Sequence, residues 1–472
     1  MMLYESFRIN GLLKRFFWFL LPSSFLFFLF ICFQIGKPFL SLVPCIALLF
    51  LIAFNYFGTI KTLTAVSIST FFIYYVEDLP IPGFITLGPT EILIIICFLF
   101  FPLFVRKDIL NFIKLIPYKK SMFLLLFSIL LTSVYIFSKS NSYFGRASYG
   151  NSKVVIFILG YVLAFYLLYY NHISIKMVFN CLIAAGILFI AAIIFYYWKS
   201  GNLNGIITQR IGTDISIHPN AIAMALDMIF PIAFFSALYY KKNMIIKVML
   251  FFFSFLFLVT LFFTYSRGSY FGLMAMGIYL FFNKIKLYKI VLFIIIIFLS
   301  FTFLYEGILY RFNKHDPAVM ESNIERVALM QSAFKMIKNN YFIFGNGMLT
   351  FSLEKYDYSF PKWIDRQKGL STHNLYLEHF VGLGLFGFLG ITFILFGTFF
   401  SLVKLKVPDK DKYIKFGLLF ALLSCMLHGF VDSQVGNIAY SLPLFLILAS
   451  AAFLIYENKN SEIPGGAVIG NP

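Results

Sequence analysis

Residues 374–402 read "NLYLEHFVGLGLFGFLGITFILFGTFFSL", an apolar run interrupted by one acidic residue and one histidine. A helix needs about 20 predominantly apolar residues to cross a bilayer, so this run predicts a transmembrane helix. Similar runs recur along the chain, in which 61% of the residues are hydrophobic and only 12% are charged. Soluble domains carry about 25% charged residues. The composition therefore excludes a disordered chain and an ordinary soluble enzyme.

The apolar runs predict an all-α polytopic membrane protein with about 12–14 transmembrane helices. We expect an N-terminal membrane bundle over residues 1–305, with about 11 spans, and three further helices over 373–456. A large extracytoplasmic loop is expected over 306–372, and a cytoplasmic tail over 457–472. The runs lie at 16–35, 38–57, 61–76, 90–105, 121–138, 153–170, 177–198, 219–240, 247–265, 269–283, 289–305, 374–402, 413–430 and 437–456.

The charge balance is 38 basic against 20 acidic residues, a formal net charge of +18. No soluble basic module is visible, so a nucleic-acid partner is not expected. The basic residues instead form short clusters that all fall on one side of the predicted membrane, which the positive-inside rule makes cytoplasmic. These clusters lie at 14–15, 106–120, 241–242, 284–289 and 404–415. Both termini are then cytoplasmic.

The loop at 306–372 contains "ESNIERVALMQSAFKMIKNN", at residues 321–340, which predicts an amphipathic helix against the outer face of the bundle. Ser322 and Glu325 form a capping-box pattern at its expected start. The apolar face is expected to carry Ile324, Val327, Met330, Phe334 and Ile337.

Membrane topology does not explain four arginines on the outer side. Arg267, in "TYSRGSYFGL", sits between two apolar runs, where it either caps the short turn and snorkels to the interface or binds an anion. A guanidinium suits phosphate because its planar fork offers bidentate, charge-assisted hydrogen bonds. Arg326, on the amphipathic helix, is either an exposed helix charge or a phosphate ligand. Arg210 either binds phosphate or pairs with Asp214, and Arg146 carries the weakest case for a site.

His373 opens the run at 374–402. A neutral imidazole there can accept a proton, so a general base is one interpretation. The other is a histidine that only donates hydrogen bonds at a helix end, with Ser371 or Thr372 as the cap. Asn374 is a further cap or a sugar ligand, and Glu378, one turn on, is placed to orient it.

Gly382, Gly384, Gly387 and Gly390 predict close helix packing. Asp227 lies inside an apolar run ahead of Pro231, and two interpretations stay open: a functional carboxylate, or one that satisfies backbone freed by the proline.

His428 and Asp432, in "HGFVDSQVGN", are weak candidates. The five cysteines include no CxxC pair, so neither a disulfide framework nor a zinc site is expected. No sequence motif on the outer side calls for a metal or another cofactor.

Three segments in order resemble the O-antigen ligase and O-antigen polymerase superfamily: "YSRGSYFGL", then "RVALMQSAFKMIKNNYFIFGNGMLTF", then "THNLYLEHFVGLGLFG". The resemblance covers about residues 206–390. It implies a GT-C-type helical bundle, a donor glycan on undecaprenyl pyrophosphate, and transfer without a metal. It also implies pyrophosphate binding by Arg267, Arg326 and Arg210, and acceptor activation by His373.

The resemblance leaves the acceptor open. A ligase moves the glycan to a hydroxyl of a lipid A core or a similar acceptor, on the outer face of the bacterial inner membrane, and this is the reading we prefer. A polymerase joins lipid-linked repeat units. A lipid-linked oligosaccharide flippase or another transporter is the remaining alternative, although it would not need a structured loop of this size.

Overall fold

The computed structural model describes ten segments of the chain, and all of them belong to one compact unit. They are residues 79–81, 85–87, 109–137, 141–171, 173–199, 219–240, 243–282, 317–358, 371–433 and 438–461. The spans expected before residue 106, the run at 289–305 and Arg210 lie outside these segments.

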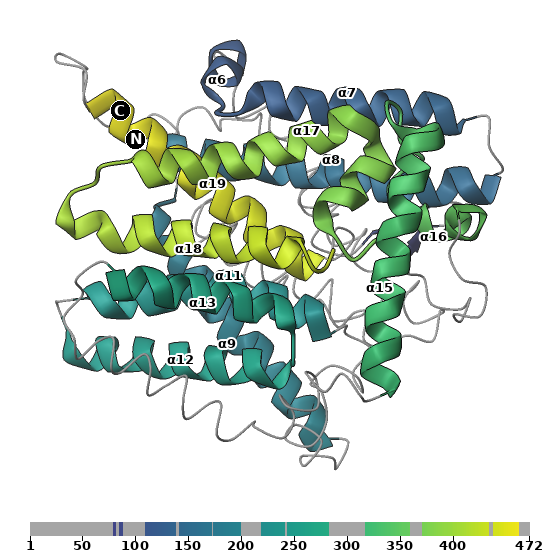
Figure 1. Ribbon diagram of the computed structural model, residues 1–472. Coiled ribbons are helices and arrows are strands. Elements are labelled where there is room, and N and C mark those ends of the chain that lie inside the picture. The colour runs from purple at the N-terminus through teal and green to yellow at the C-terminus, as the bar shows by residue number, and fades with distance from the viewer. Residues whose placement is uncertain are drawn as a thin grey trace, which may run out of the picture. The chain divides into compact units, whose positions relative to one another are not determined.

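The described residues form long helices, most of which run alongside one another (Figure 1). Seven of them are long and apolar enough to cross a membrane, which confirms the all-α polytopic fold class. These seven are α7 (Lys119–Ile136), α8 (Asn141–Tyr169), α9 (Ile175–Lys199), α11 (Pro219–Tyr239), α12 (Met244–Phe263), α17 (Leu375–Lys404) and α19 (Ile438–Ser461).

Two further helices complete the parallel set, α13 (Arg267–Phe282) and α18 (Lys412–Gly429), which pack against each other. Short α6 (Ile109–Leu115) precedes α7, and the 3₁₀ turn η5 (Asp409–Asp411) precedes α18. A small antiparallel hairpin of β1 (Leu79–Ile81) and β2 (Ile85–Leu87) is the one sheet within the described segments. The last helix continues to Ser461, past the expected span end at 456.

Helix α11 forms the centre of the packing and contacts α9, α12, α13, α18 and α19. Its sequence is apolar all round, as expected for a helix with neighbours on every side. Nearly every residue from Pro219 to Leu238 is buried, including the carboxylate of Asp227. A charge at this depth is stable only with partners, which makes Asp227 a point of interest for the site.

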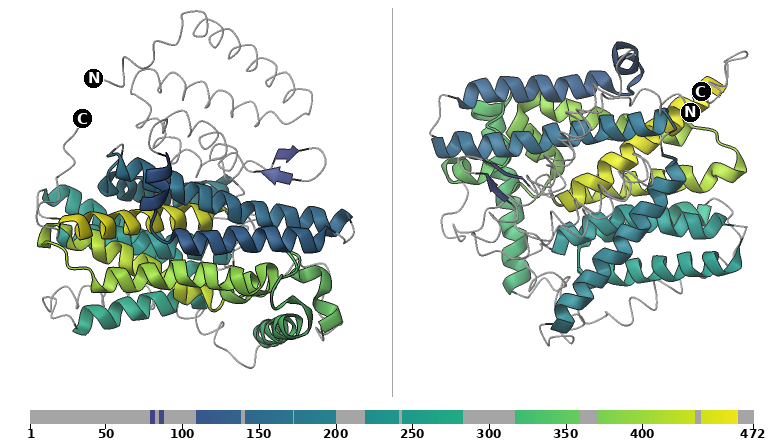
Figure 2. Two further views of the ribbon diagram at one scale, coloured as in Figure 1. Left: turned by 90° about the horizontal axis from the view of Figure 1, so that it is seen from above. Right: turned by 180° about the vertical axis from the view of Figure 1, so that it is seen from behind.

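Helix α15 (Pro317–Met336) runs across the ends of the parallel helices rather than beside them (Figure 1), and the view from behind agrees (Figure 2). It starts at Pro317 rather than after Ser322, so the expected capping box lies inside the helix. Proline is well suited to the first helical position because its fixed φ is already helical and its missing N–H is not needed there.

The face of α15 that packs is only partly the predicted one: Ile337 is buried and Met330 packs against the core, but the other three predicted residues do not. Ala328, Leu329, Ala333 and Met336 are buried in a core cluster with Ile337 and Tyr341. Ile324, Val327 and Phe334 are instead 40%, 55% and 57% exposed. The helical spacing of apolar residues fits both the buried face and the exposed one. The buried face packs because the small side chains of Ala328 and Ala333 let α15 come closer to its neighbours.

The chain continues from α15 into a π-helical turn, η3 (Ile337–Tyr341), and a glycine-containing loop that reaches a break in α17. Gly384 has φ 67° and ψ −166°, a conformation open essentially to glycine alone. Three backbone hydrogen bonds of 2.8 Å join the loop to the break: Asn346 N–H to Val381 O, Gly347 N–H to Gly382 O, and Leu385 N–H to Phe342 O. The loop is thereby fixed to the helix.

Hydroxyls of α7 complete this junction: Ser128 donates to the carbonyl of Leu383, and Thr132 to that of Phe344. The four glycines of α17 therefore have two roles. Gly387 and Gly390 pack closely against Ser128 and Leu125 of α7, as the sequence predicts. Gly382 and Gly384 leave room for the loop backbone. Beyond the loop follow α16 (Phe351–Glu354) and the 3₁₀ turn η4 (Lys355–Tyr358).

Candidate active site

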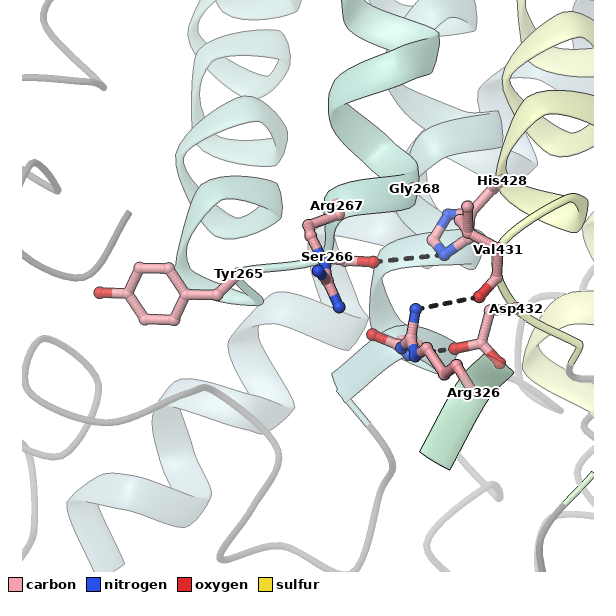
Figure 3. A pocket seen from close by; sticks show the side chains of 9 residues that line it. Tyr265, Ser266, Arg267, Gly268, Arg326, His428, Val431 and Asp432 are labelled. Atoms are coloured by element: carbon pink, nitrogen blue, oxygen red, sulfur yellow. Dashed lines mark hydrogen bonds between the residues drawn. The ribbon is translucent and has the colours of Figure 1, made fainter. Parts of the chain in front are cut away.

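A small polar pocket opens where α11 and α13 begin and α18 ends, beside α15 (Figure 3). Its lining combines cationic, anionic and hydroxyl groups at the end of an otherwise apolar bundle. The lining residues are Asn220, Tyr265, Ser266, Arg267, Gly268, Arg326, His428, Val431 and Asp432.

The Ser-Arg-Gly turn forms one side of the pocket. Residues 264–266 connect α12 to α13, and Tyr265 turns the chain with φ 48°. Arg267 is half-buried, and its side chain extends from the start of α13 toward the other lining side chains (Figure 3). Gly268 lies directly against the imidazole of His428, which a Cβ at this position would strike. The glycine thus lets α13 and α18 approach each other at the pocket.

Arg326 reaches the pocket from α15. Its Nη1 donates a hydrogen bond to the carbonyl of Val431 at 3.1 Å, which holds the guanidinium beside the end of α18 (Figure 3). The two arginines come from segments separated by residues 283–316 along the chain, and the fold brings both to one pocket.

His373 and Asp432 form a hydrogen-bonded pair next to these arginines. His373 Nδ1 lies 3.0 Å from Asp432 Oδ1, and the two side chains are 16% and 1% exposed. Asp432 lines the pocket, so His373 borders it through this carboxylate. Asn220 Nδ2 donates to the other carboxylate oxygen, and the N–H of Ser433 donates to Oδ1 at 2.7 Å.

The environment of Asp432 favours its charged form. Burial raises the pKa of this carboxyl, but the hydrogen bond from His373 outweighs that effect together with the charges of His373, His428 and Arg326. The pKa of Asp432 consequently lies well below its usual range. A permanent carboxylate at Nδ1 fixes the ring of His373 with its proton on Nδ1, which directs a lone pair to Nε2.

Asn374 and Glu378 hold His373 in place. Asn374 caps α17: its Oδ1 accepts from the N–H groups of Tyr376 and Leu377, both at 3.0 Å. Its Nδ2 donates to the carbonyl of Phe430 at 3.0 Å. These bonds occupy the amide, so it acts as a cap that links α17 to the end of α18 rather than as a ligand pointing outward.

The buried carboxylate of Glu378 accepts from the N–H of Thr372 at 2.8 Å, and therefore orients the residue before His373 rather than Asn374. His373 itself has φ 49°, an uncommon conformation for a residue with a side chain. Backbone bonds on both sides of it keep the imidazole turned toward Asp432.

A second histidine–aspartate pair lies deeper, between α11 and α18. His428 Nδ1 is 2.6 Å from Asp227 Oδ2, and both side chains are almost fully buried. Ser269 also donates to Asp227 Oδ2 at 2.9 Å, while Ser266 Oγ lies 3.2 Å from His428 Nε2. Asp227 therefore bonds to side chains rather than to backbone freed by Pro231.

The sequence-predicted residues thus divide into three groups. Arg267, Arg326 and His373 meet at one end of the bundle. Arg210 lies outside the described residues, and Arg146 is exposed on α8 and does not line the pocket. From the sequence alone, three other residues of the site carry little weight. The only signal for His428 and Asp432 is their spacing in "HGFVD", and the only signal for Asn220 is a polar side chain at a helix start.

Within the described segments, no group of three or more His, Cys, Asp or Glu side chains is arranged to hold a metal ion. The expectation that the reaction needs no metal stays a prediction.

Comparison with known proteins agrees with the resemblance noted from the sequence. Residues 251–392 match the family model described as O-antigen ligase. The matched segment contains Arg267, Arg326 and His373, whereas Asn220, Asp227, His428 and Asp432 lie outside it. No curated protein matches the chain significantly. The matched segment and the ordered motifs make this chain similar to the O-antigen ligase family over residues 251–392, and its seven long apolar helices make it a multi-pass membrane protein.

Proposed function

We propose that the protein transfers a glycan from undecaprenyl pyrophosphate to an acceptor hydroxyl, at the outer face of the bacterial inner membrane. The observation that carries the proposal is the meeting of two arginines with a histidine–carboxylate pair at one small pocket. Arg267 and Arg326 both line it, and His373 borders it through Asp432. A donor phosphate and an acceptor hydroxyl can therefore be held side by side.

The arginines would bind the pyrophosphate of the donor. Their guanidinium groups remain charged at any physiological pH and offer paired donors to phosphate oxygens. Charge on the leaving phosphate grows as the glycosidic bond breaks, so a preorganised pair of cations stabilises the transition state more than the ground state. Both arginines line the same pocket, so their guanidinium groups can reach one pyrophosphate together, with the glycan and the polyprenyl chain outside.

His373 would act as the general base. Its Nδ1 is committed to Asp432, and among the described residues no other side chain bonds to Nε2. Nε2 accepts the proton of the acceptor hydroxyl while the hydroxyl oxygen bonds to the anomeric carbon. The bond from that carbon to the phosphate oxygen breaks, and its electron pair leaves with the pyrophosphate. General-base help of this kind contributes about 10²–10⁴-fold.

We prefer a ligase, with a lipid A core or a similar acceptor, to a polymerase that joins lipid-linked repeats. A deletion strain examined for surface glycan separates the two. A ligase defect removes all glycan from the acceptor, whereas a polymerase defect leaves a single repeat attached. Accumulation of the donor on the inner face of the membrane would instead indicate a flippase.

Point variants test the assignment of the site. Arg267→Ala, Arg326→Ala and His373→Ala should each abolish glycan transfer in membranes that contain normal amounts of folded protein. Arg146→Ala is the matched control, because that arginine does not line the pocket, and it should retain activity. Normal transfer by the Arg267 and His373 variants would refute the proposed function.

A further inference from the structure

The buried pair of Asp227 and His428 has no part in the reaction described above, although a carboxylate inside a membrane bundle is costly. The pair reaches the pocket through His428, which is itself a lining residue, and through the hydroxyl of Ser266. Asp227 Oδ2 lies 2.6 Å from His428 Nδ1, and His428 Nε2 lies 3.2 Å from Ser266 Oγ. Ser266 is among the residues that line the pocket, and Figure 3 shows its contact with His428. The chain of bonds therefore ends at the pocket wall.

The role of Ser266 is not that of an ordinary helix cap. A serine before the first residue of a helix usually accepts a bond from an N–H two or three positions on. Here the N–H of Ser269 bonds to the backbone carbonyl of Ser266 at 3.2 Å, and the hydroxyl is turned toward His428. The hydroxyl is thus available to the imidazole and to a ligand in the pocket.

The imidazole of His428 determines whether the Ser266 hydroxyl turns its proton or its lone pairs toward the pocket. Nδ1 faces the carboxylate of Asp227, so it carries a proton, and Nε2 is the atom that faces Ser266. When the ring carries a proton on Nε2 as well, as an imidazolium paired with the carboxylate of Asp227, Nε2 donates to Ser266 Oγ. The hydroxyl proton is then left to point into the pocket, where it can meet a phosphate oxygen. Arg267, the next residue, and Arg326 supply the charge on either side of that position.

Gly268 gives independent support for this arrangement. A Cβ at Gly268 would come within 2.7 Å of the Cγ and Nε2 atoms of His428. The glycine therefore allows the imidazole to lie against the start of α13 and to reach Ser266. All three residues of the Ser-Arg-Gly turn then serve one pocket.

We propose that the Ser266 hydroxyl binds a phosphate oxygen of the polyprenyl-linked donor, and that Asp227 and His428 are positioning residues that set the direction of this hydroxyl. The proposal rests on the proposed function and adds a third phosphate ligand to it, at the residue just before α13 and beside Arg267. It also assigns the buried pair a role in donor binding rather than in acceptor activation.

Binding of undecaprenyl pyrophosphate to the purified full chain in nanodiscs tests this role. Ser266→Ala should raise the Kd about tenfold or more, as expected for loss of a hydrogen bond to a charged group. Ser266→Thr keeps a hydroxyl and should stay within about threefold of the wild type. Ser424→Ala is the control: Ser424 is a buried serine of α18 that packs against Gly272 of α13, away from the pocket, and its variant should bind normally.

A double-mutant cycle separates positioning from mere packing. If His428 acts through Ser266, then combining His428→Gln with Ser266→Ala should weaken binding little more than Ser266→Ala alone. Additive losses would instead mean that His428 supports binding by another route, and would overturn its assigned role. Thermal unfolding of each variant confirms that the protein measured is folded.

The outcomes also separate this inference from the proposed function. If Ser266→Ala binds as tightly as the wild type while Arg267→Ala does not, the hydroxyl is no ligand and the arginine site stands. If neither Arg267→Ala nor Arg326→Ala weakens binding, the phosphate site itself is refuted, and the proposed function fails with it.

Discussion

The carboxylate of Asp432 contacts three polar groups at once: the imidazole of His373, the amide of Asn220 and the N–H of Ser433. It ties together the start of α17, the start of α11 and the end of α18. At the residue scale this is where the electrostatics of the site are set, because burial alone would have favoured the neutral acid, whereas the partners favour the anion.

Asp432→Asn should lower the rate of glycan transfer by about a hundredfold or more, because an amide no longer fixes the tautomer of His373. The KM for the lipid-linked donor should change little, since Arg267 and Arg326 are untouched. Steady-state kinetics on purified protein would measure both values. A rise in KM with an unchanged maximal rate would contradict a role for Asp432 in acceptor activation.

The same carboxylate predicts an acid-sensitive contribution to stability. Its pKa is lower in the folded than in the unfolded protein, so its contribution is complete above the unfolded value of about 4 and is lost as the pH falls toward the folded value. The Tm difference between the wild type and Asp432→Asn should therefore be constant from pH 7 to about pH 5 and shrink below about pH 4. A difference that grows on acidification would contradict this assignment.

At the scale of the elements, the break in α17 links the membrane bundle to the outer loop. Backbone bonds fix the loop after η3 to the helix at Val381, Gly382 and Leu385, close to the helix start that carries His373. Through η3 the loop connects to α15, which carries Arg326. The break thus keeps His373 and Arg326 at fixed positions relative to each other.

Gly384→Ala should destabilise the protein by about 1–3 kcal/mol from backbone strain alone, because only glycine adopts its conformation readily. A Cβ would also collide with the carbonyl of Ile343. Gly397→Ala is the milder control, since that glycine is helical and meets only the ring of Tyr118. Thermal unfolding in detergent measures both, and an equal effect of the two variants would argue against the junction.

At the scale of the whole molecule, the site lies at one end of the bundle, and the lysine-rich connection from Lys404 to Lys412, between α17 and α18, lies at the other (Figure 1). Beyond its break at Gly384, helix α17 runs from Leu385 to Lys404, or about 30 Å. Helix α18 then returns to His428 and Asp432. This arrangement puts the width of a bilayer, whose hydrocarbon core is about 30 Å thick, between the site and the basic connection.

Cysteine labelling tests this sidedness. Lys338→Cys in η3 and Lys410→Cys in η5 are both exposed positions, and they should react with a membrane-impermeant thiol reagent from opposite sides of the membrane. We expect Lys338→Cys to label from outside intact cells, and Lys410→Cys only after lysis. A background without native cysteines is needed because Cys181 and Cys425 are free thiols. Labelling of both positions from one side would overturn the topology.

The sequence by itself determined the membrane class, the positions of the described spans and the candidates Arg267, Arg326 and His373. Hydrophobic length and a charge between apolar runs are local signals, so they can be read along the chain. The packed face of α15 was predicted only in part, at Met330 and Ile337, because two sets of apolar residues fit the same helical period. The roles of Gly382 and Gly384 were also hidden, since a glycine shows only that space is needed and not what fills it.

Only the tertiary structure decided which polar residues meet. Asp432 lies 59 residues from its partner His373, and His428 lies 201 residues from Asp227. In the sequence, Asp432 and His428 are ordinary polar residues near a helix end. Asp432 and His428 acquire their partners only because α11, α13, α17 and α18 pack together at one end of the bundle. Burial there makes an unpaired charge costly, so the pairs that form are fixed by geometry and not by distance along the chain.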